Sequence, residues 1–218
     1  MIQLDVISDP ICPWCYIGKA NLDRAIETTG QNPFTMAWRI FQLNPDMPLE
    51  GMDRKTYLER KFGGPEGARD VYGRIEGAAK SAGLDVRFDR VARTPNTFDA
   101  HRLIRWSQTT GTQHAVVNQM FRRYFEDGQD ISDRAILLDI ADSAGMERDV
   151  VARLLDSDAD REELQAEEAT ARQMGVTGVP CFIINGQHVV QGAQDTATWE
   201  RIITELSASL ANRQEVSS

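Results

Sequence analysis

Two cysteines near the start of the chain, Cys12 and Cys15, have the spacing of a reactive dithiol. Only Pro13 and Trp14 separate them, so the two thiols lie one turn apart if the segment is helical. Such a pair can exchange disulfides with another thiol, or it can supply half of a metal site. The chemistry indicated by this segment is therefore redox exchange or metal binding.

A zinc site would need more ligands than this pair supplies. Structural zinc usually has four protein ligands, and the other candidate ligands are scattered along the chain without a second closely spaced pair. These candidates are Cys181, His101, His114 and His188. We therefore interpret the pair as a redox dithiol and expect no metal.

The elements around the pair favour redox chemistry. The apolar segment Ile2–Ser8 predicts a strand, and the apolar spacing after the pair predicts a helix from Pro13 to about Thr28. Proline suits the first position of a helix, where its missing N–H is not needed. The helix N-terminus favours the thiolate form of Cys12, and Cys15 lies close enough to resolve a mixed disulfide that Cys12 has formed.

The remaining strand signals lie at the two ends of the chain. A second strand is predicted over Phe34–Phe41. Near the C-terminus, Cys181–Ile184 and His188–Gln191 flank Asn185-Gly186, which is a strong hairpin signal. Neither end alone has enough strands to form a stable sheet, so both ends are expected to meet in one sheet.

Helical patterns dominate the region between these strands. Glycine or a polar cap marks the end or the start of each predicted helix. Ser157 and Asp160 resemble a capping box at the start of a helix that reaches Met174. The other predicted helices are 54–62, 65–82, 98–109, 113–125, 133–144, 147–155 and a last helix that carries Trp199, followed by a tail that frays from Asn212.

Composition excludes several functional classes. The chain has 218 residues, 41% of them hydrophobic, and a formal net charge of -9. Nucleic acids and anionic membranes attract basic surfaces, so neither is an expected partner. No apolar run is long enough to span a bilayer, and the first residues lead directly into strand-like sequence without a leader pattern. The expected location is the cytoplasm, where three cysteines indicate redox chemistry and not a disulfide scaffold.

Several motifs together resemble the DsbA family of the thioredoxin superfamily. They are Cys12-Pro13-Trp14-Cys15, the β-α-β…α-β-β-α order, Gly178-Val179-Pro180 before a strand, and a long helical insertion after the second strand. Further segments resemble the cytoplasmic FrnE-like branch of this family. These are Ser8 to Cys15, Gly51 to Gly63, Asn96 to Leu103, and Tyr124-Phe125 through Asp130 to Asp133.

The resemblance implies an α/β thioredoxin fold with a large all-helical insertion. Residues 1–50 and 161–218 would form a discontinuous thioredoxin-like domain, and residues 51–160 an inserted helical domain. It also implies a cis peptide between Val179 and Pro180 that faces the dithiol, with the Val179 backbone pairing with an extended substrate. The residues expected to contact substrate are Pro13, Trp14, Val179, Pro180 and, on the wall of the groove, His101.

The activity that this resemblance implies is thiol–disulfide exchange. Cys12 would be the nucleophile and Cys15 the resolving thiol, acting on proteins or small molecules that contain a disulfide or a thiol. No cofactor is expected, although glutathione could serve as a co-substrate. The sequence leaves open whether oxidation, reduction or isomerisation dominates.

Two other functions remain as alternatives. The architecture also resembles 2-hydroxychromene-2-carboxylate isomerases and kappa-class glutathione transferases, but these families typically carry a serine where this chain has Cys12. A peptide-binding or chaperone-like module with an idle dithiol is the non-enzymatic alternative. Each predicts a different response to substitution of the two cysteines.

Three positions, Trp14, Cys181 and His101, carry a functional and a structural interpretation. Trp14 either contributes to substrate contact or packs beside the dithiol. Cys181 directly follows Pro180 and is either a third thiol near Cys12 or, as we favour, a small buried hydrophobic residue. His101 either lines the groove or, more commonly for such a residue, is partly exposed on a helix. His114 and His188 are interpreted as bystanders.

Overall fold

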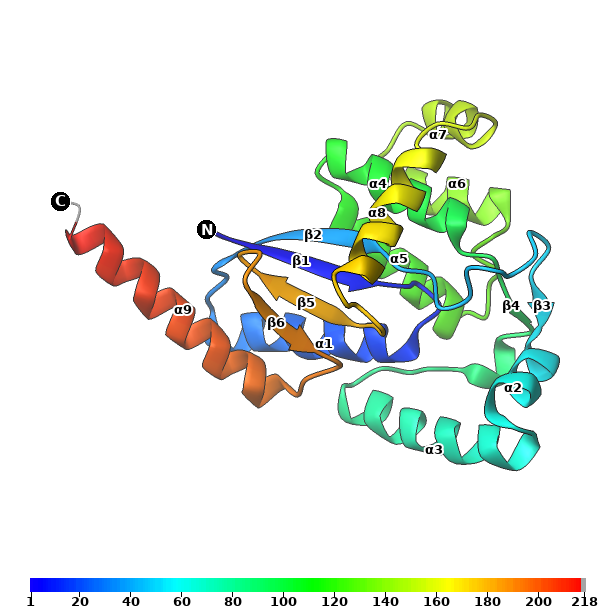
Figure 1. Ribbon diagram of the computed structural model, residues 1–218, viewed down its shortest axis with the longest axis horizontal. Helices are drawn as coiled ribbons and strands as arrows, with labels where there is room; N and C mark the ends of the chain where they lie inside the picture. Colours follow the sequence, from blue (N-terminus) through cyan, green and yellow to red (C-terminus); the bar gives the residue numbers. More distant parts are fainter. Residues whose placement is uncertain (217–218) are drawn as a thin grey trace.

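Four strands form the central sheet, in the order β2-β1-β5-β6 (Figure 1). The computed structural model describes residues 1–216. β1 pairs in parallel with β2 and antiparallel with β5, and β6 pairs antiparallel with β5. The strands are β1 Ile2–Ser8, β2 Phe34–Ile40, β5 Cys181–Ile184 and β6 His188–Gln191. The two ends of the chain therefore meet in one sheet, as the sequence predicts.

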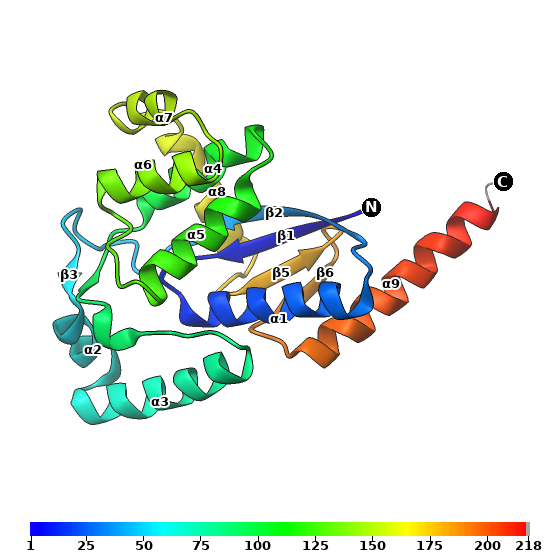
Figure 2. The ribbon, with the colours of Figure 1, turned by 180° about the vertical axis from the view of Figure 1, so that it is seen from behind.

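Side chains along β1 alternate between the two faces of this sheet. Leu4 and Val6 belong to the main hydrophobic cluster, together with Trp199 of the last helix. Ile7 belongs to a second cluster with Cys181. Helices α1 (Pro13–Thr29) and α9 (Thr196–Val216) cover the first face, and α8 (Arg161–Gln173) lies on the other, as Figures 1 and 2 show.

The hairpin between β5 and β6 has the turn that its sequence predicts. Asn185 and Gly186 have φ angles of 52° and 66°, so both lie in the left-handed region. A two-residue turn of this kind matches the twist of the flanking strands. This prediction is confirmed.

The region between β2 and α8 contains the predicted helices. Each helix predicted between residues 54 and 155 is present, with both ends within one residue of the prediction. The helices are α2 Arg54–Phe62, α3 Pro65–Ser81, α4 Phe98–Thr109, α5 Gln113–Phe125, α6 Arg134–Ser143 and α7 Arg148–Leu155. Three short elements were not predicted: β3 (Met52–Asp53), which pairs with β4 (Arg93–Thr94), and a 3-10 turn over Phe88–Arg90.

These helices lie on two sides of the point where β1 leads into α1. Figure 1 shows α2 and α3 as a pair on one side and α4 to α7 gathered on the other, and the reverse view agrees. Contacts of α4 and α5 with β2 connect the second group to the sheet. The division into residues 1–50 with 161–218 and an insertion over 51–160 stays a prediction.

The predicted capping box at the start of α8 is wrong. Asp160 has a φ of 60° and makes no side-chain cap for the helix. Its carboxylate instead accepts hydrogen bonds from Arg105 Nε and Trp106 Nε1, and the Ser157 hydroxyl donates to the Leu154 carbonyl. The Asp160 carboxylate therefore binds side chains of α4 and does not cap the start of α8, although the local sequence pattern predicts such a cap.

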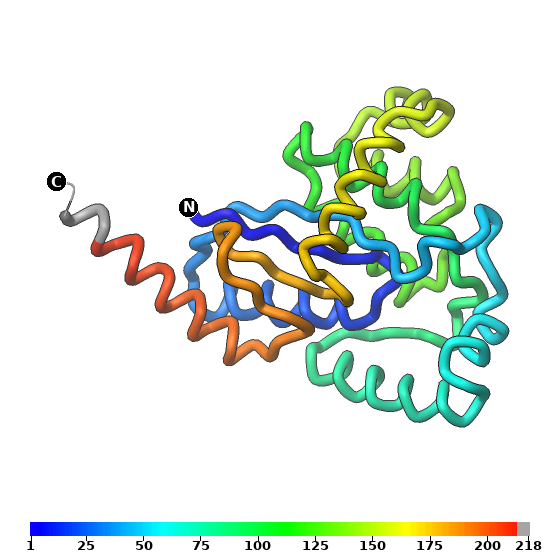
Figure 3. Tube along the Cα trace, in the orientation of Figure 1, coloured from blue at the N-terminus to red at the C-terminus, as the bar shows by residue number. Residues whose placement is uncertain are grey.

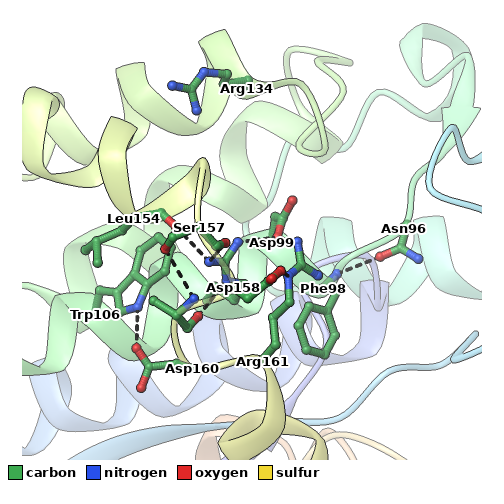
Figure 4. A network of polar contacts seen from close by, with 12 residues as sticks. Asn96, Phe98, Asp99, Trp106, Arg134, Leu154, Ser157, Asp158, Asp160 and Arg161 are labelled. Carbon is green, nitrogen blue, oxygen red and sulfur yellow. Dashed lines mark hydrogen bonds and ion pairs between the residues drawn. The ribbon is translucent and has the colours of Figure 1, made fainter.

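A buried arginine on α4 holds the segment before α8. The guanidinium of Arg102 is fully buried and donates to the backbone carbonyls of Leu154, Ser157 and Ala159. It also pairs with Asp99, 2.9 Å away. Figure 4 shows this network between α4 and the loop that precedes α8. The contacts fix α8 against the helical layer.

The last helix extends beyond the sheet. α9 packs along α1 at its start and then projects away from the rest of the protein, as the trace in Figure 3 shows. It runs to Val216, so the fraying expected from Asn212 is not seen up to that residue, and residues 217–218 lie outside the described range. Among residues 1–216, no helix combines the length and the apolar character needed to cross a membrane.

Candidate active site

The dithiol lies where β1 passes into α1. Cys12 is the N-cap of α1, with extended backbone angles, and Pro13 is the first helical residue. The backbone N–H of Cys15 donates to the Cys12 carbonyl at 3.0 Å, which places the second thiol one turn further on. Both side chains are buried, at 3% and 1% exposure, and both are free thiols. Within residues 1–216, the structure contains no cluster of three or more histidine, cysteine or acidic residues that could hold a metal ion.

The loop before β5 faces the first thiol. The Cys12 Sγ donates to the carbonyl oxygen of Val179 at 3.6 Å, although 167 residues separate the two positions. The Val179–Pro180 peptide bond is cis. The Pro180 carbonyl accepts from Gly192 N at 2.8 Å, and the Gln191 side chain donates to the Gly178 carbonyl. The Val179 carbonyl is thus held beside Cys12 by contacts with β6 and the residue after it.

A glycine allows this loop to approach α1 closely. A Cβ atom at Gly18 would lie 3.2 Å from Pro180 Cγ and 3.3 Å from Ala193 Cα. Contacts this short would force the neighbouring atoms to move. Gly18 therefore sets the distance between the helix that carries the dithiol and the loop that faces it.

The two thiols differ in their surroundings. Burial raises the pKa of the Cys15 thiol well above its ordinary value, and the adjacent Cys12 raises it further. Hydrogen bonds to Cys15 from the Asp9 backbone and the Ser8 side chain only partly oppose this rise. Cys15 therefore keeps its proton at neutral pH, and it must lose that proton before it can attack a disulfide.

An acidic residue lies buried next to the pair. Asp9 is fully buried, its carbonyl accepts from Cys12 N, and its carboxylate accepts from the backbone N–H of Leu43 at 2.7 Å and of Ile11 at 3.3 Å. Burial raises the pKa of Asp9 from 3.8 to about 7, and these hydrogen bonds only partly lower it. The carboxyl group therefore changes charge near neutral pH.

His101 lies deeper than either interpretation of its sequence position suggested. Its side chain is 2% exposed, so the expected partial exposure is wrong, and the ring has no open face toward solvent. Burial lowers its pKa from 6.5 to about 3, and a hydrogen bond to the Phe41 backbone only partly opposes this. Its Nε2 atom lies 3.8 Å from Asp9 Oδ1. His101 is thus a buried, neutral residue next to Asp9.

Of the other residues considered from the sequence, Pro13 and Trp14 lie at the dithiol, and His114 and His188 lie elsewhere. Trp14 is 39% exposed beside the buried thiols, and Pro13 is half-buried, so both are accessible to a bound substrate. His114 lies on α5, next to Lys19 and Asp23. His188 is exposed on β6. Neither of these histidines belongs to the dithiol site.

Cys181 lies on the sheet face opposite to α1. It is buried with Ile7, Phe41 and Val176, in a cluster separate from the one that contains Cys12 and Cys15. Burial alone raises the pKa of the Cys181 thiol. This placement supports the interpretation as a small buried hydrophobic residue.

Two features near the dithiol were missed by sequence reasoning. Asp9 was part of the recognised motif, but no role was assigned to it, although an acid between an apolar strand and a dithiol is a signal of a buried titratable group. Arg54 and Tyr72 lie on α2 and α3 and are joined by a hydrogen bond, and Tyr72 lies within electrostatic range of Cys12. No local pattern indicates this contact, because it depends on how the two helices pack.

The comparisons with known proteins agree with this geometry. The family model described as a DSBA-like thioredoxin domain matches residues 3–204. The crystal structure of a probable DsbA oxidoreductase from Streptomyces coelicolor is similar, with a TM-score of 0.84 and 29% identity, over 95% of this chain and 91% of that one. The uncharacterized protein YwbO of Bacillus subtilis is 25% identical over 94% of this chain and 96% of its own length.

A more distant structure has the same fold. The cytosolic disulfide reductase DsbM of Pseudomonas aeruginosa, whose structure was determined with glutathione (GSH), has a TM-score of 0.65 and 16% identity. The similarity covers 98% of this chain and 99% of that one. At this identity the likeness concerns the fold.

Proposed function

Because the chain belongs to the family of DSBA-like thioredoxin domains, we propose that it is a thiol–disulfide oxidoreductase that reacts through Cys12 and Cys15. The observation that carries this proposal is the position of Cys12. It is the N-cap of a helix, it lies one turn from a second thiol, and it faces the Val179 carbonyl. A helix N-terminus stabilises negative charge, so it favours the thiolate that attacks disulfides.

The reaction consists of two exchanges. In the first, the Cys12 thiolate attacks one sulfur of a substrate disulfide, the substrate S–S bond breaks, and one substrate sulfur leaves as a thiolate. In the second, Cys15 gives up its proton and attacks Cys12 Sγ, which releases the second substrate thiolate. The substrate gains two electrons, and the protein is left with a Cys12–Cys15 disulfide. The same steps in reverse oxidise a substrate dithiol.

Substrate recognition in this proposal uses both sides of the site. The Val179 backbone would pair with an extended segment of the substrate, and pairing through main-chain groups tolerates different sequences. Trp14 and Pro13 would contact the segment from the dithiol side. In the resting structure the Val179 carbonyl accepts from the Cys12 thiol, so the carbonyl is positioned beside the reacting sulfur.

We further propose that the protein works in the cytoplasm, with glutathione as a co-substrate that restores the dithiol. The cytosolic neighbour whose structure was determined with glutathione supports this, as does the resemblance to the FrnE-like branch. A reducing compartment keeps the dithiol reduced, which favours reduction or isomerisation of substrate disulfides.

Substitution of each cysteine tests the proposal. Cys12→Ser should abolish insulin-disulfide turnover, while Cys15→Ser should accumulate a mixed disulfide that alkylation and mass spectrometry detect. Cys181→Ser is the matched control and should leave turnover close to that of the wild type. Wild-type turnover in both Cys12→Ser and Cys15→Ser would refute the assignment.

The same variants separate the alternative functions. A glutathione-dependent isomerase would keep its isomerase activity in Cys15→Ser, because only the group at position 12 would activate glutathione. A peptide-binding module would bind unfolded clients equally well in the Cys12→Ser/Cys15→Ser double variant. The presence of both thiols at the start of one helix favours the oxidoreductase over either alternative.

A further inference from the structure

A cavity of about 540 Å³ lies between α2, α3 and the segment 88–92. We call it the α2–α3 pocket. Its walls include Leu58, Phe88 and Val91, and Arg54 and Tyr72 also line it. Figures 1 and 2 show α2 and α3 on the side of the protein where α1 begins. A volume of this size is typical of sites for small molecules.

Arg54 is the unusual residue of this pocket. The residue is buried, with an exposed fraction of 7%. It donates to the hydroxyl groups of Tyr124 at 3.1 Å and Tyr72 at 2.9 Å, and it lies 5.1 Å from the centre of the Tyr72 ring. Within residues 1–216, no carboxylate lies within 4.0 Å of this guanidinium. A buried charge without a counter-charge is costly, although aromatic rings recover part of that cost.

The other buried cations of the described chain are neutralised. Arg102 pairs with Asp99 and donates to three backbone carbonyls, and Lys19 contacts Asp23. Arg54 differs from both because it faces a cavity and has only uncharged partners. Two of its five N–H groups are used in the hydrogen bonds to tyrosine, so donors remain for a ligand.

The hydroxyl of Tyr72 supplies a second donor. It accepts a hydrogen bond from Arg54, and its own proton has no acceptor within the described residues. Tyr124 differs, because its hydroxyl donates to the Arg93 carbonyl. Arg54 and Tyr72 can therefore bind the same anion together.

Tyr72 also connects the pocket to the dithiol. Burial raises the pKa of Tyr72 above its usual value, Arg54 opposes this rise, and Cys12 is close enough to add to it. The aromatic contacts agree, since Tyr72 packs edge-on against Phe88, and Phe88 packs against Phe125, whose ring stacks on Tyr16 of α1. Tyr72 thus lies within electrostatic range of Cys12, and three ring contacts lead from it to Tyr16, the residue after Cys15.

Besides Arg54, the charged residues of the pocket lining are two cations and three acids. Lys55 and Arg69 are the other cations of the lining. Of its acidic residues, Asp53 accepts hydrogen bonds from Thr56 and Asp89 is paired with Arg87. Glu59 is the third acid and has no cation within 4.0 Å in the described chain.

We propose that the α2–α3 pocket is an anion subsite that binds a carboxylate of a small-molecule thiol or disulfide substrate, with the Arg54 guanidinium and the Tyr72 hydroxyl as donors. The proposal rests on the proposed oxidoreductase function and specifies a substrate class for it. A charge-assisted hydrogen bond to a carboxylate is among the strongest polar contacts. Binding the carboxylate would neutralise Arg54 and hold the sulfur of the same molecule near Cys12.

Three short disulfides that differ in charge test the proposal. They are 3,3′-dithiodipropionate with two carboxylates, bis(2-hydroxyethyl) disulfide without charge, and cystamine with two ammonium groups. Reaction rates are compared between wild type and Arg54→Met on each compound, because this ratio cancels the intrinsic reactivity of the disulfide. The ratio of the wild-type rate to the Arg54→Met rate should be on the order of tenfold larger for the dicarboxylate than for the neutral compound, as expected for the loss of a hydrogen bond to a charged group. Cystamine should lose least.

Arg60→Met is the matched control. Arg60 is exposed on the same helix and does not line the pocket, so its substitution changes the net charge equally. It should leave the preference among the three disulfides unchanged. Equal preferences in wild type and Arg54→Met, or an equal effect of Arg60→Met, would overturn the proposal. Tyr72→Phe and Arg54→Lys test the same donors if Arg54→Met does not fold, and Tyr72→Phe should lower the preference for the dicarboxylate.

A binding measurement separates this proposal from the oxidoreductase function. The Cys12→Ser/Cys15→Ser variant cannot exchange disulfides, so calorimetric titration with 3,3′-dithiodipropionate reports binding alone. We expect saturable binding that disappears when Arg54→Met is added. Saturable binding without any turnover by the wild type would refute only the oxidoreductase function, whereas turnover without such binding would refute only the subsite.

Discussion

Asp9 and His101 lie side by side in the protein interior, with Asp9 Oδ1 3.8 Å from His101 Nε2. Burial acts on both groups in the direction of neutrality, because it raises the pKa of Asp9 to about 7 and lowers the pKa of His101 to about 3. Between these values the acid keeps its proton and the ring has none. The two residues are therefore a pair of neutral groups in this range and not an ion pair.

The raised pKa of Asp9 predicts a loss of stability as the pH rises. Between pH 3.8 and about 7, the folded state retains the Asp9 proton that the unfolded state releases, so the free energy of unfolding falls across this range. The difference of about three pKa units corresponds to roughly 4 kcal/mol. Asp9→Asn removes this term. Its stability relative to wild type, measured by urea unfolding, should therefore increase from pH 4.5 to pH 8, and a constant difference would contradict the prediction.

The lowered pKa of His101 predicts the opposite dependence of stability on pH. Below pH 6.5 His101 binds a proton in the unfolded state, but in the folded state it stays neutral down to about pH 3. The wild type therefore loses stability as the pH falls. This term is on the order of 5 kcal/mol and partly cancels that of Asp9 between pH 4 and pH 6.5. His101→Asn should thus gain stability relative to wild type as the pH falls from 7 to 4.5. A relative stability that changes in the same direction as that of Asp9→Asn would show that the pair is assigned wrongly.

Gly18 predicts how closely α1 and the loop before β5 must approach. A Cβ atom there would lie 3.2 Å from Pro180 Cγ, while a Cβ atom at Gly77 in α3 would contact nothing within 4 Å. Gly77→Ala should stabilise the protein by roughly 0.5–1 kcal/mol, because alanine is the better residue in a helix interior. Gly18→Ala should gain less, and Gly18→Val should lose about 1–3 kcal/mol together with disulfide turnover. An equal gain from the two alanine variants in urea unfolding would contradict this role of Gly18.

Local patterns in the sequence were sufficient for most of the fold. The strand Ile2–Ser8 and the hairpin at Asn185-Gly186 were predicted because alternation and turn chemistry act within a few residues. The two-residue strands at Met52–Asp53 and Arg93–Thr94 were not predicted, because so short a pairing depends on distant segments meeting. The start of α8 was misassigned for the same reason, since Trp106 and Arg105 bind the Asp160 carboxylate.

The site shows the same division between local and distant information. The spacing of Cys12 and Cys15, with a proline between them, was enough to predict a dithiol at the start of a helix. The burial of His101 could not be read from its helix alone, because it results from packing of α4 against β2. Arg54 and Tyr72 meet only through the packing of α2 against α3.

The hydrogen bonds of Arg102 predict that this one buried cation contributes strongly to the free energy of unfolding. It is fully buried and donates to Leu154, Ser157 and Ala159, so Arg102→Met leaves several carbonyls without a donor (Figure 4). We expect a loss of roughly 3 kcal/mol in the free energy of unfolding. Arg134→Met is the control, because Arg134 is exposed and pairs with Asp156 at the surface, where such pairs contribute about 0–1 kcal/mol. Equal losses in the two variants would contradict the buried role of Arg102.

Cys181 predicts a thiol that stays outside the redox reaction. It packs with Ile7, Phe41 and Val176 on the sheet face opposite to α1, and burial raises its pKa, so its reactive thiolate is disfavoured. Cys181→Ala should keep wild-type turnover, and Cys181→Ser should keep turnover but lose about 1–3 kcal/mol of stability, because it buries a hydroxyl group among apolar side chains.

Mass spectrometry of the oxidised protein gives the direct test. Digestion under acidic conditions should yield one peptide that contains an internal Cys12–Cys15 disulfide, and a separate peptide with an alkylatable Cys181. A peptide pair joined through Cys12 and Cys181 would contradict the placement of Cys181 on the far face of the sheet. It would require β5 to separate from β1, since Cys181 pairs with Ile7 in the register of these strands.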